Sequence, residues 1–173
     1  EEGRPRWHLL LRRALRDGAG DAALTLRLPY DGVSRSQRAT AALAARLALG
    51  LRAGDAIGLI GDLGAGKTVF VRGLARALGL PPDVVVASPT FTVMNSLRGG
   101  RLPIYHFDLY RLSDLDELEG IGYRDFVGTD GVAVFEWADK IAGALPPDAY
   151  TVVITDGEAD NERRIRIQRG SSS

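Results

Sequence analysis

The stretch Gly61-Asp62-Leu63-Gly64-Ala65-Gly66-Lys67-Thr68 decides the fold of this 173-residue chain. It matches the pattern G-x-x-x-x-G-K-[ST], which is that of a phosphate-binding P-loop. The apolar run 56–60 before it is typical of a buried strand, and residues 69–78 after it have the pattern of a helix. A phosphate-binding loop requires this order of strand, loop and helix. The sequence therefore predicts a site for a nucleoside triphosphate.

The residue types of this loop each have a chemical reason. Glycines let backbone N–H groups converge on phosphate oxygens in conformations that a side chain would hinder. The start of the following helix adds unpaired N–H groups and a positive dipole end. Lys67 is predicted to reach the β- and γ-phosphates, and the Thr68 hydroxyl to hold Mg²⁺. A glycine-rich turn that binds nothing is the alternative, and the flanking strand and helix argue against it.

Composition favours a globular domain without a net basic charge, which leaves room for a local basic patch. Hydrophobic residues make up 45% and charged residues 25% of the chain, which is ordinary. Lysine plus arginine and aspartate plus glutamate both number 22, so nothing points to nucleic acid as a main direct partner. The lack of cysteine excludes disulfides and is expected of a cytoplasmic protein. No apolar run is long enough to span a bilayer, so no membrane partner is expected.

One α/β domain is predicted. Residues 1–20 are expected to be an N-terminal extension with an amphipathic helix of no assigned role, residues 21–170 the P-loop ATPase domain, and residues 171–173 a tail. Helices alternate with apolar strands, which predicts a central mixed, mainly parallel sheet flanked by helices. The expected strands are 24–28, 56–60, 84–86, 91–94, 102–107, 132–135, 150–155 and 164–168, and the expected helices begin near residues 36, 69 and 114.

Glu136 directly follows the apolar run 132–135. Because α/β sheets bind ligands at the carboxyl ends of their strands, its carboxylate is expected beside the P-loop. A P-loop enzyme needs such a carboxylate on the metal side, so Glu136 is predicted to hold Mg²⁺, directly or through a water molecule. An ordinary acid at a strand end is the alternative. The next residue, Trp137, is expected to pack beneath the site rather than to cap it.

Asp108 belongs to a third cluster, residues 106–111. Its carboxylate is expected either to orient the attacking water or contact the metal's water shell, or to form a structural ion pair with Arg111. These two interpretations remain open on the residues alone. His106 is expected to be a hydrogen-bonded packing residue rather than a general base.

The segment Ser88-Pro89-Thr90-Phe91 follows an apolar run, where P-loop proteins often carry a segment that senses the γ-phosphate. The Thr90 hydroxyl is predicted to contact Mg²⁺ or water, whereas the preceding Ser88-Pro89 is equally typical of a plain turn. A metal site of the His/Cys type is excluded, because the chain has two distant histidines and no cysteine.

Four segments, in this order and spacing, closely resemble the TsaE family, the bacterial P-loop ATPases of tRNA threonylcarbamoyladenosine synthesis. They are the P-loop, Ser-Pro-Thr-Phe (88–91), His-Phe-Asp-Leu-Tyr-Arg-Leu (106–112) and Glu-Trp (136–137). The resemblance covers residues 24–168, and the His-Phe-Asp-Leu-Tyr-Arg run combined with a P-loop is specific. It implies a compact α/β fold with a mixed sheet that binds ATP with Mg²⁺ and hydrolyses it weakly alone.

The resemblance also implies partners. Such proteins act with TsaD and TsaB, which modify adenosine 37 of tRNAs reading ANN codons, so tRNA is expected to be reached only through that complex. Their ATPase activity is thought to reset or support the complex rather than to transfer the carbamoyl group. ATP rather than GTP rests on the resemblance, because the chain has no N-K-x-D run.

Carried over by motif, the resemblance implies a set of site residues. Asp108 is needed for hydrolysis, and Thr68 with Glu136 holds Mg²⁺. The complete catalytic set is Lys67, Thr90, Asp108 and Glu136, and the nucleotide-binding set is Gln37, Thr40, Leu63, Gly64, Ala65, Gly66, Lys67, Thr68, Val69, Asp108 and a C-terminal arginine, either Arg163 or Arg164.

Two departures and two alternatives accompany this prediction. The family commonly has a Glu-Tyr pair where this chain has 95–97, and a proline where it has Ala138, which bears on partner contacts and not on nucleotide binding. One alternative is a small-molecule P-loop kinase, which would need an Arg-rich lid, and the best such stretch, 160–164, is short. The other is a non-catalytic module that recruits partners in its nucleotide-bound shape.

Overall fold

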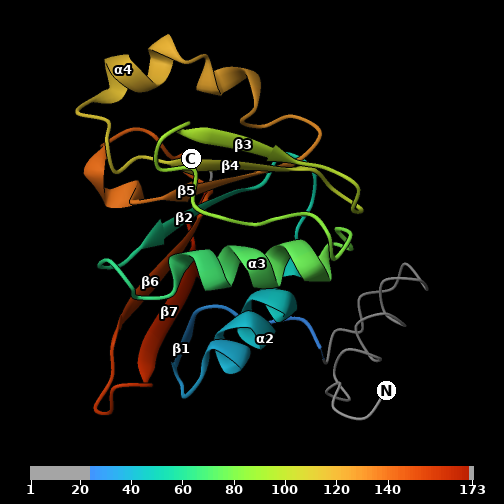
Figure 1. Ribbon diagram of the computed structural model, residues 1–173, viewed down its shortest axis with the longest axis vertical. Coiled ribbons are helices and arrows are strands. Elements are labelled where there is room, and N and C mark those ends of the chain that lie inside the picture. The colour runs from blue at the N-terminus through green and yellow to red at the C-terminus, as the bar shows by residue number, and fades with distance from the viewer. Residues whose placement is uncertain (1–23, 172–173) are drawn as a thin grey trace.

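A seven-stranded sheet forms the middle layer of the structure, a computed structural model that describes residues 24–171 (Figure 1). The strands lie in the order β1-β7-β6-β2-β5-β4-β3. They span Tyr30–Ser34 (β1), Ala56–Ile60 (β2), Met94–Leu97 (β3), Ile104–Asp108 (β4), Val132–Glu136 (β5), Tyr150–Asp156 (β6) and Arg163–Arg169 (β7). The predicted N-terminal extension and tail residues 172–173 lie outside the described residues.

The sheet has a parallel centre and antiparallel edges. β6, β2, β5 and β4 run parallel to one another, whereas β1 and β7 on one side and β3 on the other pair antiparallel. The predicted α/β class with a central mixed sheet flanked by helices is therefore confirmed. The description "mainly parallel" holds for the four central strands only, because β3 and β7 join the sheet through hairpins and β1 pairs antiparallel with β7.

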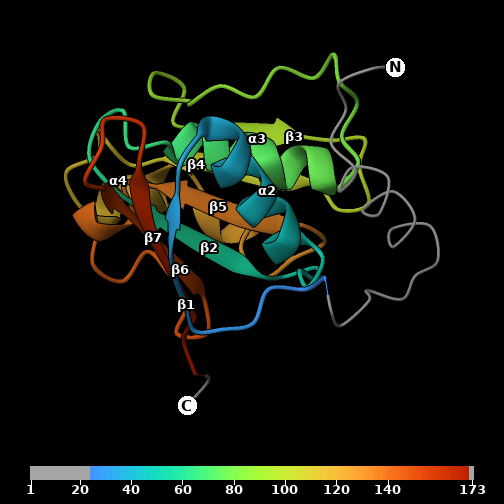
Figure 2. The same cartoon turned by 90° about the horizontal axis from the view of Figure 1, so that it is seen from below.

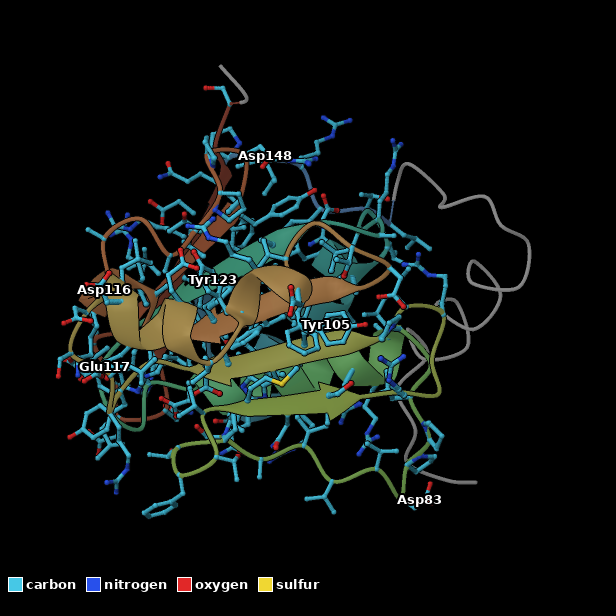
Figure 3. The ribbon with its side chains drawn as sticks, turned by 90° about the horizontal axis from the view of Figure 1, so that it is seen from above. Asp83, Tyr105, Asp116, Glu117, Tyr123 and Asp148 are labelled. Atoms are coloured by element: carbon cyan, nitrogen blue, oxygen red, sulfur yellow. The ribbon has the colours of Figure 1, made fainter. Side chains whose placement is uncertain are left out.

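Helices cover both faces of the sheet (Figures 1 and 2). α2 (Gln37–Ala48) and α3 (Lys67–Ala77) pack side by side on one face, and α4 (Leu115–Gly120) lies over the other. Two short 3-10 helices, η1 (Tyr123–Asp125) and η2 (Ala138–Lys140), complete the chain. Each face has its own apolar cluster, and Tyr105 and Tyr123, labelled in Figure 3, belong to the one on the α4 side.

Two predicted strands are wrong. Residues 24–28 form no strand. Leu26 is buried in the core and its N–H donates to the Arg46 carbonyl (3.4 Å), so this segment packs against α2 and not against a strand. The first strand, β1, begins after it. Residues 84–86 lie in a loop, where Val85 is 78% exposed. No strand of the described sheet pairs with this β-branched run, so it forms no strand despite its high β-propensity.

β3 and β4 form an antiparallel hairpin that turns at residues 98–103. Its first strand begins later than the predicted 91–94. The Val93 N–H donates to the Pro89 carbonyl (2.7 Å), and this turn delays the start of β3 until Met94.

Side chains cap two of the helices. Ser36 caps α2, because its hydroxyl accepts a hydrogen bond from the Ala39 N–H (3.0 Å). Asp114 caps α4, because its carboxylate accepts from the Glu117 N–H (3.0 Å).

Gly73 sets the distance between α2 and α3. A Cβ added at this position would lie 2.6 Å from the Ala41 carbonyl oxygen and 2.9 Å from the Ala44 Cβ. Both neighbours belong to the helix opposite, so a side chain at Gly73 would push the two helices apart. α3 begins at the end of the P-loop, and this close approach therefore also fixes where α2 stands relative to the loop.

We predict that Gly73→Ala destabilises the protein by about 1–3 kcal/mol, as overpacking of a core does. For a chain of this size the melting temperature falls by roughly 2–4 °C per kcal/mol. Gly120→Ala is the matched control, because nothing lies within 4 Å of a Cβ added there. Thermal unfolding followed by circular dichroism tests this. Equal melting temperatures for the two variants would show that the helices are not packed as described.

Candidate functional site

The carboxyl ends of β2, β5 and β4 meet at one edge of the sheet, on the left of Figure 1. β2 runs into the P-loop, β5 ends at Glu136 and β4 ends at Asp108. Glu136 is in register with Leu59 on one side and with Asp108 on the other. Because side chains alternate along a strand, both carboxylates point to the face that α3 covers, opposite the buried Phe107 and Phe135.

A cavity of about 580 Å³ opens at this edge. It brings the whole predicted site together: Gln37, Thr40, Leu63, Gly64, Ala65, Gly66, Lys67, Thr68, Val69, Thr90, Asp108, Glu136 and Arg163. Six further residues that the predicted set leaves out also line it: Ser36, Ser88, Tyr110, Trp137, Asp160 and Asn161. The roles predicted for these residues remain predictions, but their positions are compatible with one ligand.

The P-loop has the backbone that its glycines predict. Gly64 (φ +79°) and Gly66 (φ +108°) are left-handed, and nothing lies within 4 Å of a Cβ built on either. At Gly61 an added Cβ would meet the Ile154 carbonyl oxygen at 2.6 Å, so this position requires glycine for close packing against β6. α3 starts at Lys67 without a side-chain cap. Its first-turn N–H groups thus have no partner inside the helix.

Lys67 is buried under this loop, with 5% of its surface exposed. Its ammonium donates to the Gly61 carbonyl and to the Asp62 carbonyl (2.9 Å), and it lies 3.9 Å from the centre of the Trp137 ring. Burial lowers the pKa of Lys67, and the carboxylate of Glu136 is the first of several acids that oppose this shift. A phosphate oxygen in the cavity would compete with the two carbonyls for the ammonium protons.

Trp137 both packs and lines the cavity. Its backbone is left-handed (φ +59°), which is uncommon outside glycine and is frequent where a site holds a strained residue. The ring packs against the core on the α4 side and lies 5.0 Å from the ring of Tyr110. The prediction that Trp137 packs is thus correct, but the residue also contributes a wall of the site.

Glu136 is buried and has three polar neighbours. Its Oε1 accepts from the Thr68 hydroxyl (3.1 Å) and lies 2.8 Å from Nε2 of His106, while its Oε2 lies 3.3 Å from Oγ of Ser88, which makes a shorter contact with Asp108. His106 is therefore hydrogen-bonded, as predicted. A hydroxyl and a carboxylate in contact are oxygen ligands of the kind that Mg²⁺ prefers, so Thr68 and Glu136 fit the predicted magnesium site.

Asp108 is held by the segment that the sequence singled out before it. Its carboxylate accepts hydrogen bonds from Ser88, from the Thr90 hydroxyl (2.9 Å) and from the Tyr110 N–H (2.9 Å). The guanidinium of Arg111 lies over the ring of Phe91 instead, 4.4 Å from its centre. The geometry thus favours the interpretation in which Asp108 belongs to the site over the one in which it pairs with Arg111.

The two candidate arginines are separated by the alternation of β7. Arg163 lines the cavity, and its guanidinium donates to the Asp160 and Glu162 carbonyls (both 2.8 Å). Arg164 points to the opposite face, where it forms a bidentate pair with Asp31 (2.8 and 2.9 Å). Of the two, Arg163 is the one in a position to approach a nucleotide.

This fold and loop define an α/β domain of the P-loop NTPase type. The model of the family "Threonylcarbamoyl adenosine biosynthesis protein TsaE" matches residues 34–165. The chain is 41% identical to TsaE of Bacillus subtilis over 73% of its length and 77% of that protein, and 41% identical to TsaE of Treponema pallidum over 78% and 97%. The chain belongs to the TsaE family.

A solved structure agrees with this assignment. The crystal structure of Bacillus subtilis YdiB superposes with a TM-score of 0.70 at 32% identity, over 82% of this chain and 86% of that one. Within residues 24–171, no helix combines the length and the apolar character needed to cross a membrane.

We predict that Lys67 titrates below the ordinary range of a lysine, because burial disfavours its charged form. Replacing Glu136 by glutamine removes the largest opposing charge and should lower the pKa of Lys67 further. NMR titration of ¹³C-lysine-labelled protein measures this, with Lys140→Arg as background so that one lysine signal remains.

Glu119→Gln is the control, since this acid pairs with Arg124 at the surface of α4. A Lys67 pKa at its ordinary value, or a rise in the Glu136→Gln variant, would contradict the described burial.

Proposed function

We propose that this chain is the ATP-binding and ATP-hydrolysing subunit of tRNA threonylcarbamoyladenosine biosynthesis, dependent on Mg²⁺ and active in the cytoplasm. Its relatives in Bacillus subtilis and Treponema pallidum are named as tRNA threonylcarbamoyladenosine biosynthesis proteins, which supports the pathway. We further propose that it acts with homologues of TsaD and TsaB on adenosine 37 of tRNAs reading ANN codons. It would then reach tRNA through that complex.

The observation that carries the enzymatic part is the contact between the P-loop and β5. The Thr68 hydroxyl at the start of α3 donates to Glu136 at the end of β5 (3.1 Å), directly beside the buried Lys67. A phosphate cradle, an ammonium and a metal-side acid thus meet in one cavity, which is the set that phosphoryl transfer to water requires.

Each residue then has a defined part. Loop amides and Lys67 stabilise the charge that builds on the transferred phosphoryl group. Thr68 and Glu136 would hold Mg²⁺, which would neutralise part of the charge of the phosphates. Asp108, positioned by its bond from Thr90 (2.9 Å), orients the attacking water.

The structure argues against a kinase lid at residues 160–164. These residues are the turn between β6 and β7 and the start of β7. The turn is attached to the start of α2, because the Asn161 side chain donates to the Arg35 carbonyl (3.0 Å) and Glu162 pairs with the Arg35 guanidinium (3.1 Å). A segment tied down in this way is a wall of the site, and water as the acceptor is the better supported choice.

We predict that Lys67→Ala mainly weakens ATP binding, whereas Glu136→Ala mainly lowers ATP turnover. Lys67→Ala should weaken ATP binding on the order of 100-fold, because a charge-assisted contact to phosphate is worth about 1.5–3 kcal/mol. Glu136→Ala should keep measurable binding and lose about 10²–10³-fold in turnover, as on loss of a preorganised electrostatic group. Calorimetry and phosphate release measure the two quantities.

Arg164→Ala is the control for both, because it removes an arginine from the far face of β7 and should retain parental binding and turnover. If Glu136→Ala hydrolysed ATP as fast as the parent chain, the assignment of the metal-side acid would be wrong.

The proposed function itself is tested by measuring ATP hydrolysis alone and with the TsaD and TsaB homologues. We expect weak turnover alone and clear stimulation by the pair, and no stimulation in the Glu136→Ala variant. Nucleotide-dependent binding to the pair with unchanged turnover would instead establish a non-catalytic module. Stimulation of ADP release by a small metabolite would establish a kinase.

A further inference from the structure

A buried histidine lies under the candidate site, and it has no role in the proposed function. His106 has no exposed surface and lies two residues before Asp108 on β4, so both side chains are on the same face of the strand. Its Nε2 lies 2.8 Å from Oε1 of Glu136. Its Nδ1 is the one buried side-chain nitrogen or oxygen in residues 24–171 that has no hydrogen-bond partner.

These two surroundings determine where the imidazole carries its proton. An ionised carboxylate only accepts hydrogen bonds, so the ring must donate from Nε2 to Glu136. Nδ1 has no partner among the described residues, so the bond from Nε2 is the one hydrogen bond that orients the ring there.

We propose that His106 is a positioning residue that donates a hydrogen bond from Nε2 to Glu136 and fixes the orientation of the Glu136 carboxylate. Oε1 is engaged by His106 on the core side and by Thr68 on the P-loop side (3.1 Å). Among the described residues only Ser88 lies near Oε2, at 3.3 Å, and its hydroxyl makes the shorter contact with Asp108. His106 thus determines which oxygen the protein uses and which one keeps a lone pair for Mg²⁺ or its water.

The consequence for catalysis rests on the proposed function, but the state of the imidazole does not. Groups that orient a metal ligand typically change metal affinity or activity 10–100-fold when they are removed. Loss of His106 should therefore lower the rate of Mg²⁺-dependent hydrolysis and leave the affinity of the P-loop for the nucleotide largely unchanged.

The first test reads the tautomer in protein without nucleotide or metal. The chain has two histidines, so His8→Gln leaves His106 as the single imidazole in long-range ¹H–¹⁵N NMR spectra. We expect a protonated Nε2. An unprotonated Nε2 would overturn the proposal even if the protein proved to be an active ATPase.

The second test replaces His106 by asparagine or by glutamine, whose side-chain amides differ in length. The side-chain nitrogen of glutamine can occupy the position of Nε2, whereas that of asparagine occupies the position of Nδ1. His106→Asn should lower kcat about 10–100-fold and raise the Mg²⁺ concentration for half-maximal turnover, with little change in KM for ATP. His106→Gln should recover kcat to within a few-fold of the parent.

ATP binding in EDTA and the melting temperature are measured on both variants. We expect metal-free ATP binding to stay within a few-fold of the parent. Equal loss of kcat in both variants, or a loss that only follows their melting temperatures, would assign His106 a purely structural part and overturn the proposal. An inactive parent chain would refute the proposed function, and the tautomer measurement would still test His106.

Discussion

The parallel pairing of β2, β5 and β4 is the constraint on which the site depends. It puts Glu136 in register with Leu59, just before the P-loop, and with Asp108 on the far side. A shift of one residue would turn either carboxylate to the α4 face, because side chains alternate along a strand. The contacts of Glu136 with Thr68 and His106 would then be lost. The geometry of the site is thus a property of the sheet as much as of the loop.

This arrangement concentrates polar groups where the rest of the core is apolar. The buried polar or charged residues of the described chain are Ser34, Thr40, Lys67, His106, Asp108 and Glu136. Five of them line the cavity or contact one another beneath it, and Ser34 is bonded to Thr40 (2.8 Å). Buried charges are expensive to desolvate, and a fold keeps them where function requires them. An anionic ligand beside Lys67 would offset part of that cost.

Much of the fold and the location of the site follow from local sequence. Local sequence patterns predict the P-loop, the strand that ends at Glu136 and the helix after the loop. They fail for the runs 24–28 and 84–86, which have the residue types of strands but pair with no strand of the described sheet. Contacts across the sheet have no such signal. The bond between His106 and Glu136 depends on strand register, and the choice of Arg163 over Arg164 depends on the phase of β7.

The central claim is that this cavity holds the triphosphate of ATP beside Mg²⁺. Calorimetric titration of Mg-ATP into the folded chain tests it most directly, at two temperatures so that a heat near zero at one of them is not misleading. The account predicts saturable binding of one nucleotide per chain, displaced by ADP. The absence of saturable heat at both temperatures, from protein that circular dichroism shows to be folded, would contradict it.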